Sequence, residues 1–169
     1  MARLPGVTGE VSGRLLSKAE QATGPLNRTR ILAHCPEIAA GIAGWSDALA
    51  ASTALDPLLR QIAILVVVRR SPYETARHVK TALSLGLDAR AVEAFEEEDW
   101  MHPVFSEAQR HVFRYAMLFD GGYGVADEAF ANLQKHLTTE QIVELSALCA
   151  HAGSMARLAI ALGFDPETH

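Results

Sequence analysis

The sequence lacks several features that would assign it to well-known classes of protein. It holds two cysteines, Cys35 and Cys149, which lie far apart in 169 residues, so neighbouring cysteines cannot form a CxxC redox pair or a four-cysteine zinc site. It has no cluster of lysine and arginine with interleaved aromatic residues, and its formal net charge is −5. This composition argues against nucleic acid as a partner and against adsorption to a membrane surface.

Long hydrophobic runs are also missing. The longest unbroken apolar stretch, 62–68, has seven residues, whereas a helix needs about 20 to cross a bilayer. The first residues, Met-Ala-Arg-Leu-Pro-Gly, are not followed by the apolar region and small-residue cleavage site of a secretory signal. We therefore expect a cytoplasmic protein that does not span a membrane, and we do not expect a disulfide in that compartment.

The strict apolar/polar alternation of half-buried strands is absent too, whereas apolar residues recur at spacings of three and four. These patterns predict an all-α protein, a single-domain helical bundle. A chain of this length buries roughly 70% of the surface that it exposes when unfolded, so one domain over 1–169 suffices. Within it we expect a core at about 20–163 and a loose arm at 1–10.

Capping chemistry predicts where several helices begin and end. Asp56 precedes a proline at the first helical position, and Leu85-Gly86 offers a glycine just past a helix end. Ser106 with Gln109, and Thr138 with Gln141, fit capping boxes. Further helices are expected at 26–33 and 36–50. The acidic run 96–99 is interpreted as a solvated loop or helix end rather than a metal site.

The octapeptide 71–78, Ser-Pro-Tyr-Glu-Thr-Ala-Arg-His, is the most informative part of the chain. It places Glu74 and His78 four residues apart, which puts them on one helix face. Glutamate and histidine are frequent acid/base catalysts. Upstream, Arg60 is the only charged residue between Asp56 and Arg69, and an arginine in such apolar surroundings is a candidate anion clamp.

Structural interpretations of the same residues must be weighed. Ser71 and Glu74 fit a capping box, in which each side chain accepts from the other's backbone N–H, and this could be the whole role of Glu74. His78 could simply pack on its helix or face solvent. However, Arg60, Glu74 and His78 all lie in or beside the most apolar part of the chain. Partly desolvated ionisable groups have shifted pKa values and concentrate at functional sites.

Arg60 with 59–66, and the Glu-x-x-x-His pattern of 73–79 followed by 82–87, resemble the core of the carboxymuconolactone decarboxylase family. The resemblance extends over about 20–163, through 24–27, 32–37, 114–116 and 155–158. It implies the all-helical fold of the alkylhydroperoxidase D-like superfamily, assembly as a homo-oligomer (trimer or hexamer), and pockets between helices.

The sequence departs from parts of this superfamily. In the peroxidase branch, cysteines sit seven and four residues before the histidine, and Ser71 and Glu74 occupy those positions here. The missing CxxC pair removes thiol chemistry from this site unless Cys35 or Cys149 approaches it in space, while glutamate before the histidine matches the decarboxylase branch. Gln61 stands where the family commonly has glutamate, and 151–154 also differs, so the substrate cannot be transferred.

These observations lead to one main hypothesis and two alternatives. The main one is a cofactor-free, metal-free lyase or isomerase acting on a small apolar carboxylic acid or lactone. Arg60 would bind the substrate anion, His78 would transfer a proton at carbon, and Glu74 would support the imidazolium. Tyr73, Trp45 and His34 are weaker candidates for the pocket. The alternatives are a non-catalytic oligomeric small-molecule binding or scaffold protein and, disfavoured by the missing CxxC, a thiol peroxidase.

Overall fold

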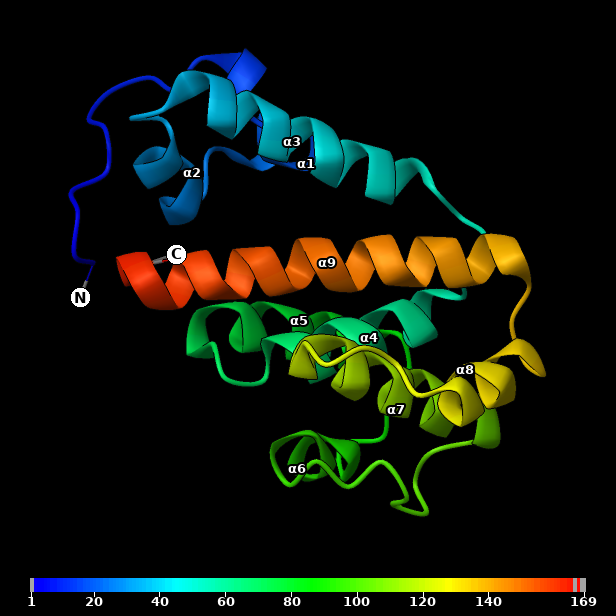
Figure 1. Ribbon diagram of the computed structural model, residues 1–169. Coiled ribbons are helices and arrows are strands. Elements are labelled where there is room, and N and C mark those ends of the chain that lie inside the picture. The colour runs from blue at the N-terminus through cyan, green and yellow to red at the C-terminus, as the bar shows by residue number, and fades with distance from the viewer. Residues whose placement is uncertain (1, 166, 168–169) are drawn as a thin grey trace. The chain divides into compact units, whose positions relative to one another are not determined.

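The computed structural model describes residues 2–165 and 167, and within them it is all-helical, with no strand (Figure 1). This confirms the fold class expected from the sequence. The elements, in chain order, are the 3-10 helix η1 (Gly13–Leu15), α1 (Lys18–Thr23), α2 (Asn27–Leu32), α3 (Pro36–Ala51), α4 (Pro57–Val68), α5 (Pro72–Ser84), α6 (Ala91–Glu96), α7 (Glu107–Gly121), α8 (Asp127–Gln134) and α9 (Thr139–Leu162).

The chain divides into two compact units. The first contains residues up to 52 together with the segment from 157 onward, and the second contains 53–156. Helix α9 contributes its longer part to the second unit and its last turns to the first. The organisation of 1–169 as a single domain remains a prediction.

In the first unit, α3 packs against η1 and α2. Val11, Leu15 and Ala39 form a small buried cluster, with partly buried neighbours around it. Residues 2–10 contain no helix, but they are hydrogen-bonded to the rest of this unit: Arg3 N–H donates to the Leu162 carbonyl at 2.9 Å, and Val7 N–H donates to the Arg30 carbonyl at 3.0 Å.

The first unit also buries a carboxylate, Glu20, which is 5% exposed. Ser17 Oγ donates to it at 2.9 Å, Leu26 N–H donates at 3.1 Å, and the Thr29 hydroxyl donates as well. Burial alone would raise the pKa of Glu20, but these hydrogen bonds, with the positive charge of Arg28, outweigh burial and lower it. The satisfied carboxylate therefore locks α1 to α2.

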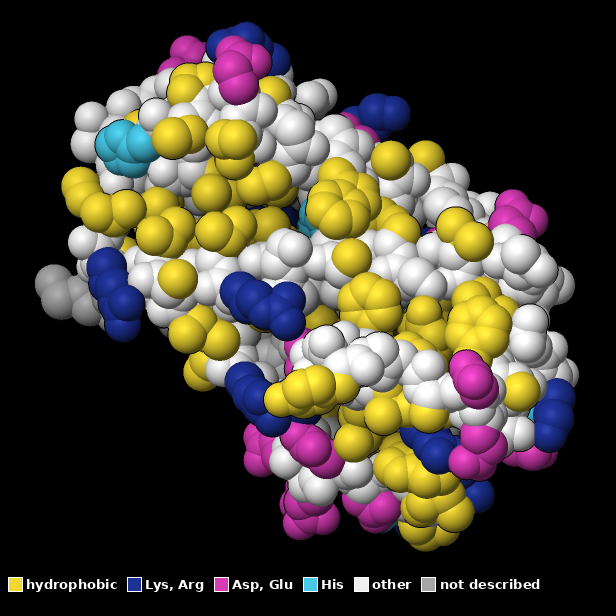
Figure 2. All heavy atoms as spheres, viewed as in Figure 1, with side chains coloured by type: hydrophobic (Ala, Val, Ile, Leu, Met, Phe, Trp, Pro, Cys, Tyr) yellow, Lys and Arg dark blue, Asp and Glu magenta, His cyan; other side chains and the backbone are white. Residues whose placement is uncertain are grey.

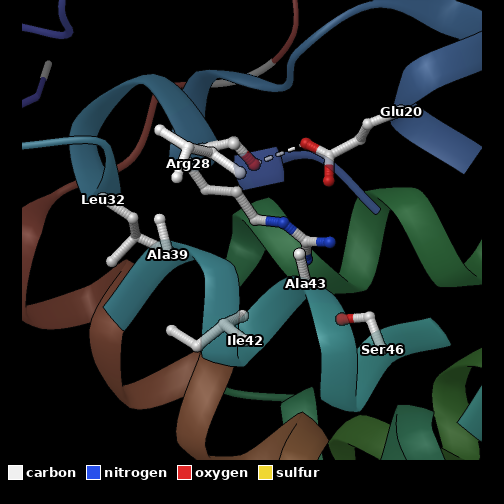
Figure 3. Close-up of a pocket in the computed structure, with 9 residues that line it drawn as sticks. Glu20, Arg28, Leu32, Ala39, Ile42, Ala43 and Ser46 are labelled. Atoms are coloured by element: carbon white, nitrogen blue, oxygen red, sulfur yellow. Dashed lines mark hydrogen bonds between the residues drawn. The ribbon is translucent and has the colours of Figure 1, made fainter. Parts of the chain in front are cut away.

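A cavity beside Glu20 is lined from η1, α1, α2 and α3, and the side chain of Arg28 extends into it (Figure 3). Its volume is about 10 Å³, close to what a single water molecule occupies. It is therefore too small for an organic substrate.

In the second unit, α4 packs against α5 and α7, and α7 packs against α8. Every residue from Ile62 to Val68 is buried, because an apolar helix that lacks a polar face needs cover on all sides. Phe95, Phe105 and Phe113 extend this core, with ring centroids 5.3–5.7 Å apart. Helix α5 thus packs against α4, which is itself buried.

Most of the expected helix ends are confirmed. Asp56 Oδ1 accepts from the N–H groups of Leu58 and Leu59, and Gly86 has the positive φ of 95° that a position after a helix end requires. Ser106 and Gln109 form a complete capping box, and Thr138 and Gln141 exchange the same two hydrogen bonds.

Arg69, in the three-residue connection between α4 and α5, is a buried charge with an 8% exposed side chain. Its Nη2 lies 2.7 Å from Glu98 Oε1, its Nη1 lies 2.9 Å from Asp120 Oδ2, and Nη1 also donates to the Val66 carbonyl at 2.6 Å. One guanidinium therefore ties the end of α4 to the loop after α6 and to the end of α7.

The acidic run 96–99 accordingly divides between solvent and structure. Glu96 and Glu97 are exposed, like Glu93, and Figure 2 shows acidic side chains gathered on the surface around α6. Glu98 instead pairs with Arg69, at a backbone φ of 57°. The hydrogen bond from Arg69 is the main cause that lowers the pKa of Glu98.

Helix α9 is long and apolar enough, by length and composition alone, to cross a membrane. The core helix of a water-soluble protein passes the same test, and 44% of the most apolar part of α9 is buried inside the structure. Polar contacts also hold it in the second unit, where Ser146 Oγ lies 2.7 Å from the Tyr115 hydroxyl. These contacts favour a core helix.

Candidate functional site

The N-terminus of α5 forms only half of the capping box expected for Ser71 and Glu74. Ser71 Oγ accepts from the Glu74 N–H at 3.5 Å. The Ser71 N–H, however, donates to the Val68 carbonyl at 2.7 Å, so the reciprocal bond to the Glu74 carboxylate is not made. The expectation of a full box was wrong because the short connection after α4 satisfies this N–H first. The Glu74 carboxylate is directed elsewhere.

That carboxylate lies against Arg77 and His78, one turn further along α5. Glu74 is 2% exposed, and its Oε2 is 3.1 Å from Arg77 Nη1 and 3.8 Å from His78 Nε2. The other ring nitrogen, His78 Nδ1, lies 3.0 Å from Gln61 Oε1 on α4. The imidazole is 23% exposed. Both ring nitrogens therefore face polar side chains, those of Gln61 and Glu74, while part of the ring reaches solvent.

Arg60, the expected anion clamp, forms an ion pair with Glu144 of α9. The Glu144 side chain is 4% exposed, and its Oε2 also accepts from the N–H groups of Ala54 and Leu55. This arrangement connects the start of α4 to α9. A substrate anion at Arg60 would have to share the guanidinium with Glu144.

The weaker candidates fall in different places. Tyr73 is buried on α5, and the Arg77 guanidinium lies 5.9 Å from the centre of its ring. His34 is exposed in the first unit, where its Nε2 lies 2.9 Å from the Pro5 carbonyl oxygen. Trp45 lies on α3 of the same unit and is 40% exposed. Glu74 and His78 thus face each other on α5 and Tyr73 lies on the same helix, while His34 and Trp45 lie in the first unit. The roles of all these residues in catalysis and binding stay predictions.

Both cysteines are free thiols, Cys35 exposed and Cys149 buried. Burial raises the pKa of Cys149 to about 12, so at neutral pH it is a thiol rather than the reactive thiolate. Cys149 is therefore unsuited to peroxide chemistry.

Sequence reasoning did not assign partners to the site residues. Arg77 lies three residues after Glu74, a spacing that already predicts an ion pair. Gln61, which departs from the family pattern, supplies the group that contacts His78 Nδ1. Glu144 carried a weaker signal, a carboxylate inside an apolar helical pattern, and nothing in the sequence linked it to Arg60.

Comparison with solved structures identifies the fold as that of AhpD-like proteins. An uncharacterised peroxidase-related protein from Ralstonia eutropha with the alkylhydroperoxidase AhpD core superposes with a TM-score of 0.81, at 18% identity, over 98% of this chain and 92% of the other. A protein of unknown function from Agrobacterium tumefaciens, a suggested antioxidant defence protein AhpD, gives a TM-score of 0.71 at 18% identity, over 82% and 96% of the two chains.

The debrominase Bmp8, solved with 2,3,4-tribromopyrrole, gives a TM-score of 0.75 at 18% identity, over 92% of this chain and 85% of its own. The fold therefore includes an enzyme. No family model and no curated protein matches this sequence. At 18% identity these likenesses define the fold, and the chemistry must be argued from the site.

Proposed function

We propose that the protein is a cofactor-free acid/base enzyme of the lyase or isomerase type, resembling carboxymuconolactone decarboxylase. Its substrate would be a small apolar carboxylic acid or lactone. The observation that carries the proposal is the position of His78, whose Nδ1 contacts Gln61 and whose Nε2 faces the buried carboxylate of Glu74. A partly exposed imidazole that is hydrogen-bonded at Nδ1 and faces a carboxylate at Nε2 is suited to moving a proton.

The two contacts define separate roles. Because the carbonyl oxygen of Gln61 can only accept, it selects the tautomer with the proton on Nδ1 and leaves the lone pair on Nε2. When Nε2 takes up a proton, the imidazolium faces the Glu74 carboxylate and is stabilised by it. Gln61 thus positions the base, and Glu74 supports its protonated form.

A decarboxylation at this site can be written so that atoms and electrons balance. The bond between the α carbon and the carboxylate breaks, carbon dioxide leaves, and the electron pair delocalises into a conjugated carbonyl as an enolate. His78 in its imidazolium form, which has taken a proton at Nε2 from solvent, then gives that proton to carbon and returns to the neutral imidazole with the proton on Nδ1. Arg60 would stabilise the enolate while sharing its charge with Glu144. We also propose that the protein is cytoplasmic and that it works as a homo-oligomer, a trimer or hexamer.

A second candidate function, non-catalytic binding of small molecules, is favoured by the ion pairs themselves. Arg60 pairs with Glu144, and Arg77 pairs with Glu74, so each acidic and basic group already has a partner of opposite charge. A thermal-shift screen with lactones, aromatic acids and acyl compounds, followed by product analysis of each hit, separates the two functions. Turnover of a stabilising compound supports the enzyme, and stabilisation without any product supports the binding protein.

Replacing Gln61 with glutamate tests the contact to His78. The new carboxylate adds a negative charge 3 Å from Nδ1 if the side chain keeps its place, so the NMR titration midpoint of His78 should move to higher pH by about one pH unit. A raised midpoint stabilises the fold at acidic pH, and this gain is lost as the pH rises through the midpoint. Gln134→Glu, at an exposed position of α8, adds the same charge and should leave the His78 midpoint unchanged. An unchanged midpoint in Gln61→Glu would show that the two side chains do not interact.

A further inference from the structure

A group of three metal-ligating side chains lies outside α4 and α5. Glu107 and His111 sit four residues apart at the start of α7, and His136 lies in the turn after α8. One ligand atom from each of the three lies within 4.8 Å of the other two. The packing of α7 against α8 brings them together, although His136 lies 25 residues after His111 and 29 residues after Glu107.

The hydrogen bonding of the two imidazoles is incomplete. His111 Nδ1 and His136 Nε2 are buried atoms without a hydrogen-bond partner. His136 Nε2 lies 3.8 Å from Glu107 Oε1, too far for a hydrogen bond. Buried ring nitrogens usually have a partner, so two unsatisfied nitrogens beside one carboxylate require an explanation.

Burial and neighbouring charges lower the pKa of one member of the group, His111. Burial is the main cause that lowers the pKa of His111, and the neighbouring His136 adds to it. Arg114 and Lys135 act in the same direction, while Glu107 opposes them. The neutral imidazole, which is the form that binds a metal ion, is therefore favoured at His111.

We propose that Glu107, His111 and His136 bind a divalent transition-metal ion of the zinc class. Two imidazoles and one carboxylate are a common set of three protein ligands for zinc, with a fourth position left for water. Imidazole nitrogens also favour such metals over calcium or magnesium, which prefer oxygen ligands.

The geometry requires a small rearrangement on binding. Ligand atoms about 2.0–2.1 Å from a tetrahedral zinc ion are about 3.4 Å apart, somewhat closer than the 3.8 Å between His136 Nε2 and Glu107 Oε1. The two imidazoles are stacked, with ring centres 5.0 Å apart and planes 21° apart, so one ring turns about its last torsion to aim its nitrogen at the metal. That torsion is soft in histidine. The bound ion would fasten the start of α7 to the turn after α8.

The test uses the full chain without a histidine tag, stripped with a chelator and titrated with zinc in a calorimeter. We expect one zinc ion per chain, a higher melting temperature with zinc, and, with cobalt(II), the visible absorption of a tetrahedral site. His111→Gln, His136→Asn and Glu107→Gln should each weaken zinc binding at least about tenfold, because each removes one of three ligands. These variants lie on the partly exposed edge of α7 and α8, and circular dichroism without metal checks that they fold.

Two matched controls separate this site from other metal-binding groups. Cys35→Ser removes the exposed thiol, and His102→Asn removes a histidine outside the group while keeping an acceptor for the Val104 N–H. Both should bind zinc as the wild type does. The proposal is overturned if the wild type binds no zinc at millimolar concentration, if the three site variants bind as tightly as the wild type, or if Cys35→Ser alone removes the binding.

Discussion

Replacing His78 with glutamine is expected to lower the turnover of a substrate found by screening about 10²- to 10⁴-fold, the usual contribution of a general acid or base. Glutamine keeps a polar group near Gln61 but cannot take up a proton at the position of Nε2. The comparison is made on kcat/KM, with the melting temperature recorded for the same preparations, so that a loss of folded protein is not mistaken for a loss of chemistry.

Glu74→Gln should lower turnover as well, because the imidazolium of His78 loses the carboxylate 3.8 Å from Nε2. The substitution keeps the backbone N–H that Ser71 caps, so the start of α5 is preserved. Ser71→Ala is the matched control: it removes the cap, costs about 1 kcal/mol of stability, and should leave turnover per folded molecule intact. If turnover survives both His78→Gln and Glu74→Gln, the acid/base mechanism is wrong.

Replacing Arg69 with methionine should reduce the free energy of unfolding by about 3–5 kcal/mol, the usual result of removing one partner from a buried ion pair. Methionine fills part of the same volume but leaves Asp120, whose side chain is 14% exposed, and Glu98 without this cation. The Val66 carbonyl loses a donor too. Urea denaturation monitored by circular dichroism measures the effect.

The neighbouring Arg70→Met provides the control for Arg69. Arg70 contacts the same Glu98 oxygen at 3.3 Å, but its side chain is 74% exposed, so its loss should cost no more than about 1 kcal/mol.

The pH dependence of the stability lost in Arg69→Met follows from Glu98, whose pKa is lowered chiefly by Arg69. Stability from a lowered carboxylate pKa is present above the ordinary pKa and is lost as the pH falls through the lowered one. The difference in stability between wild type and Arg69→Met should therefore shrink in acid. A difference that stays constant as the pH falls through the lowered pKa of Glu98 would contradict this account.

The sequence predicted the helices that carry strong local signals and missed three of the short ones. The helix at Pro57–Val68 has an aspartate cap, a proline at its first position and an apolar run, and all three act within the segment itself. The helices Lys18–Thr23, Ala91–Glu96 and Asp127–Gln134 have six to eight residues, too few to show a clear period. Packing onto neighbouring helices helps decide that such segments are helical, although the Ser17-x-x-Glu20 capping box is a local signal that could have placed the start of the first one.

The candidate site divides in the same way. The pairing of Glu74 with His78 could be predicted, because residues four apart meet on any helix. The pairing of Arg60 with Glu144 joins residues 84 positions apart and depends on how α9 returns to α4. The pattern Glu-x-x-Arg-His occurs twice, at 74–78 and again at 107–111. What separates the two copies is their surroundings, since His136 approaches the second and Gln61 the first.

Arg69 has a consequence for how mutations in this protein are interpreted. Only residues 69–71 join α4 to α5, and the distance between Gln61 and His78 depends on that connection. A survey of variants scored by activity alone would thus rank Arg69 beside His78, although the contacts of its guanidinium are structural ones with Glu98, Asp120 and Val66. Scoring the same variants at low temperature, where marginally stable proteins remain folded, would separate Arg69, which stabilises the connection between α4 and α5, from His78 and Glu74, which we propose act in proton transfer.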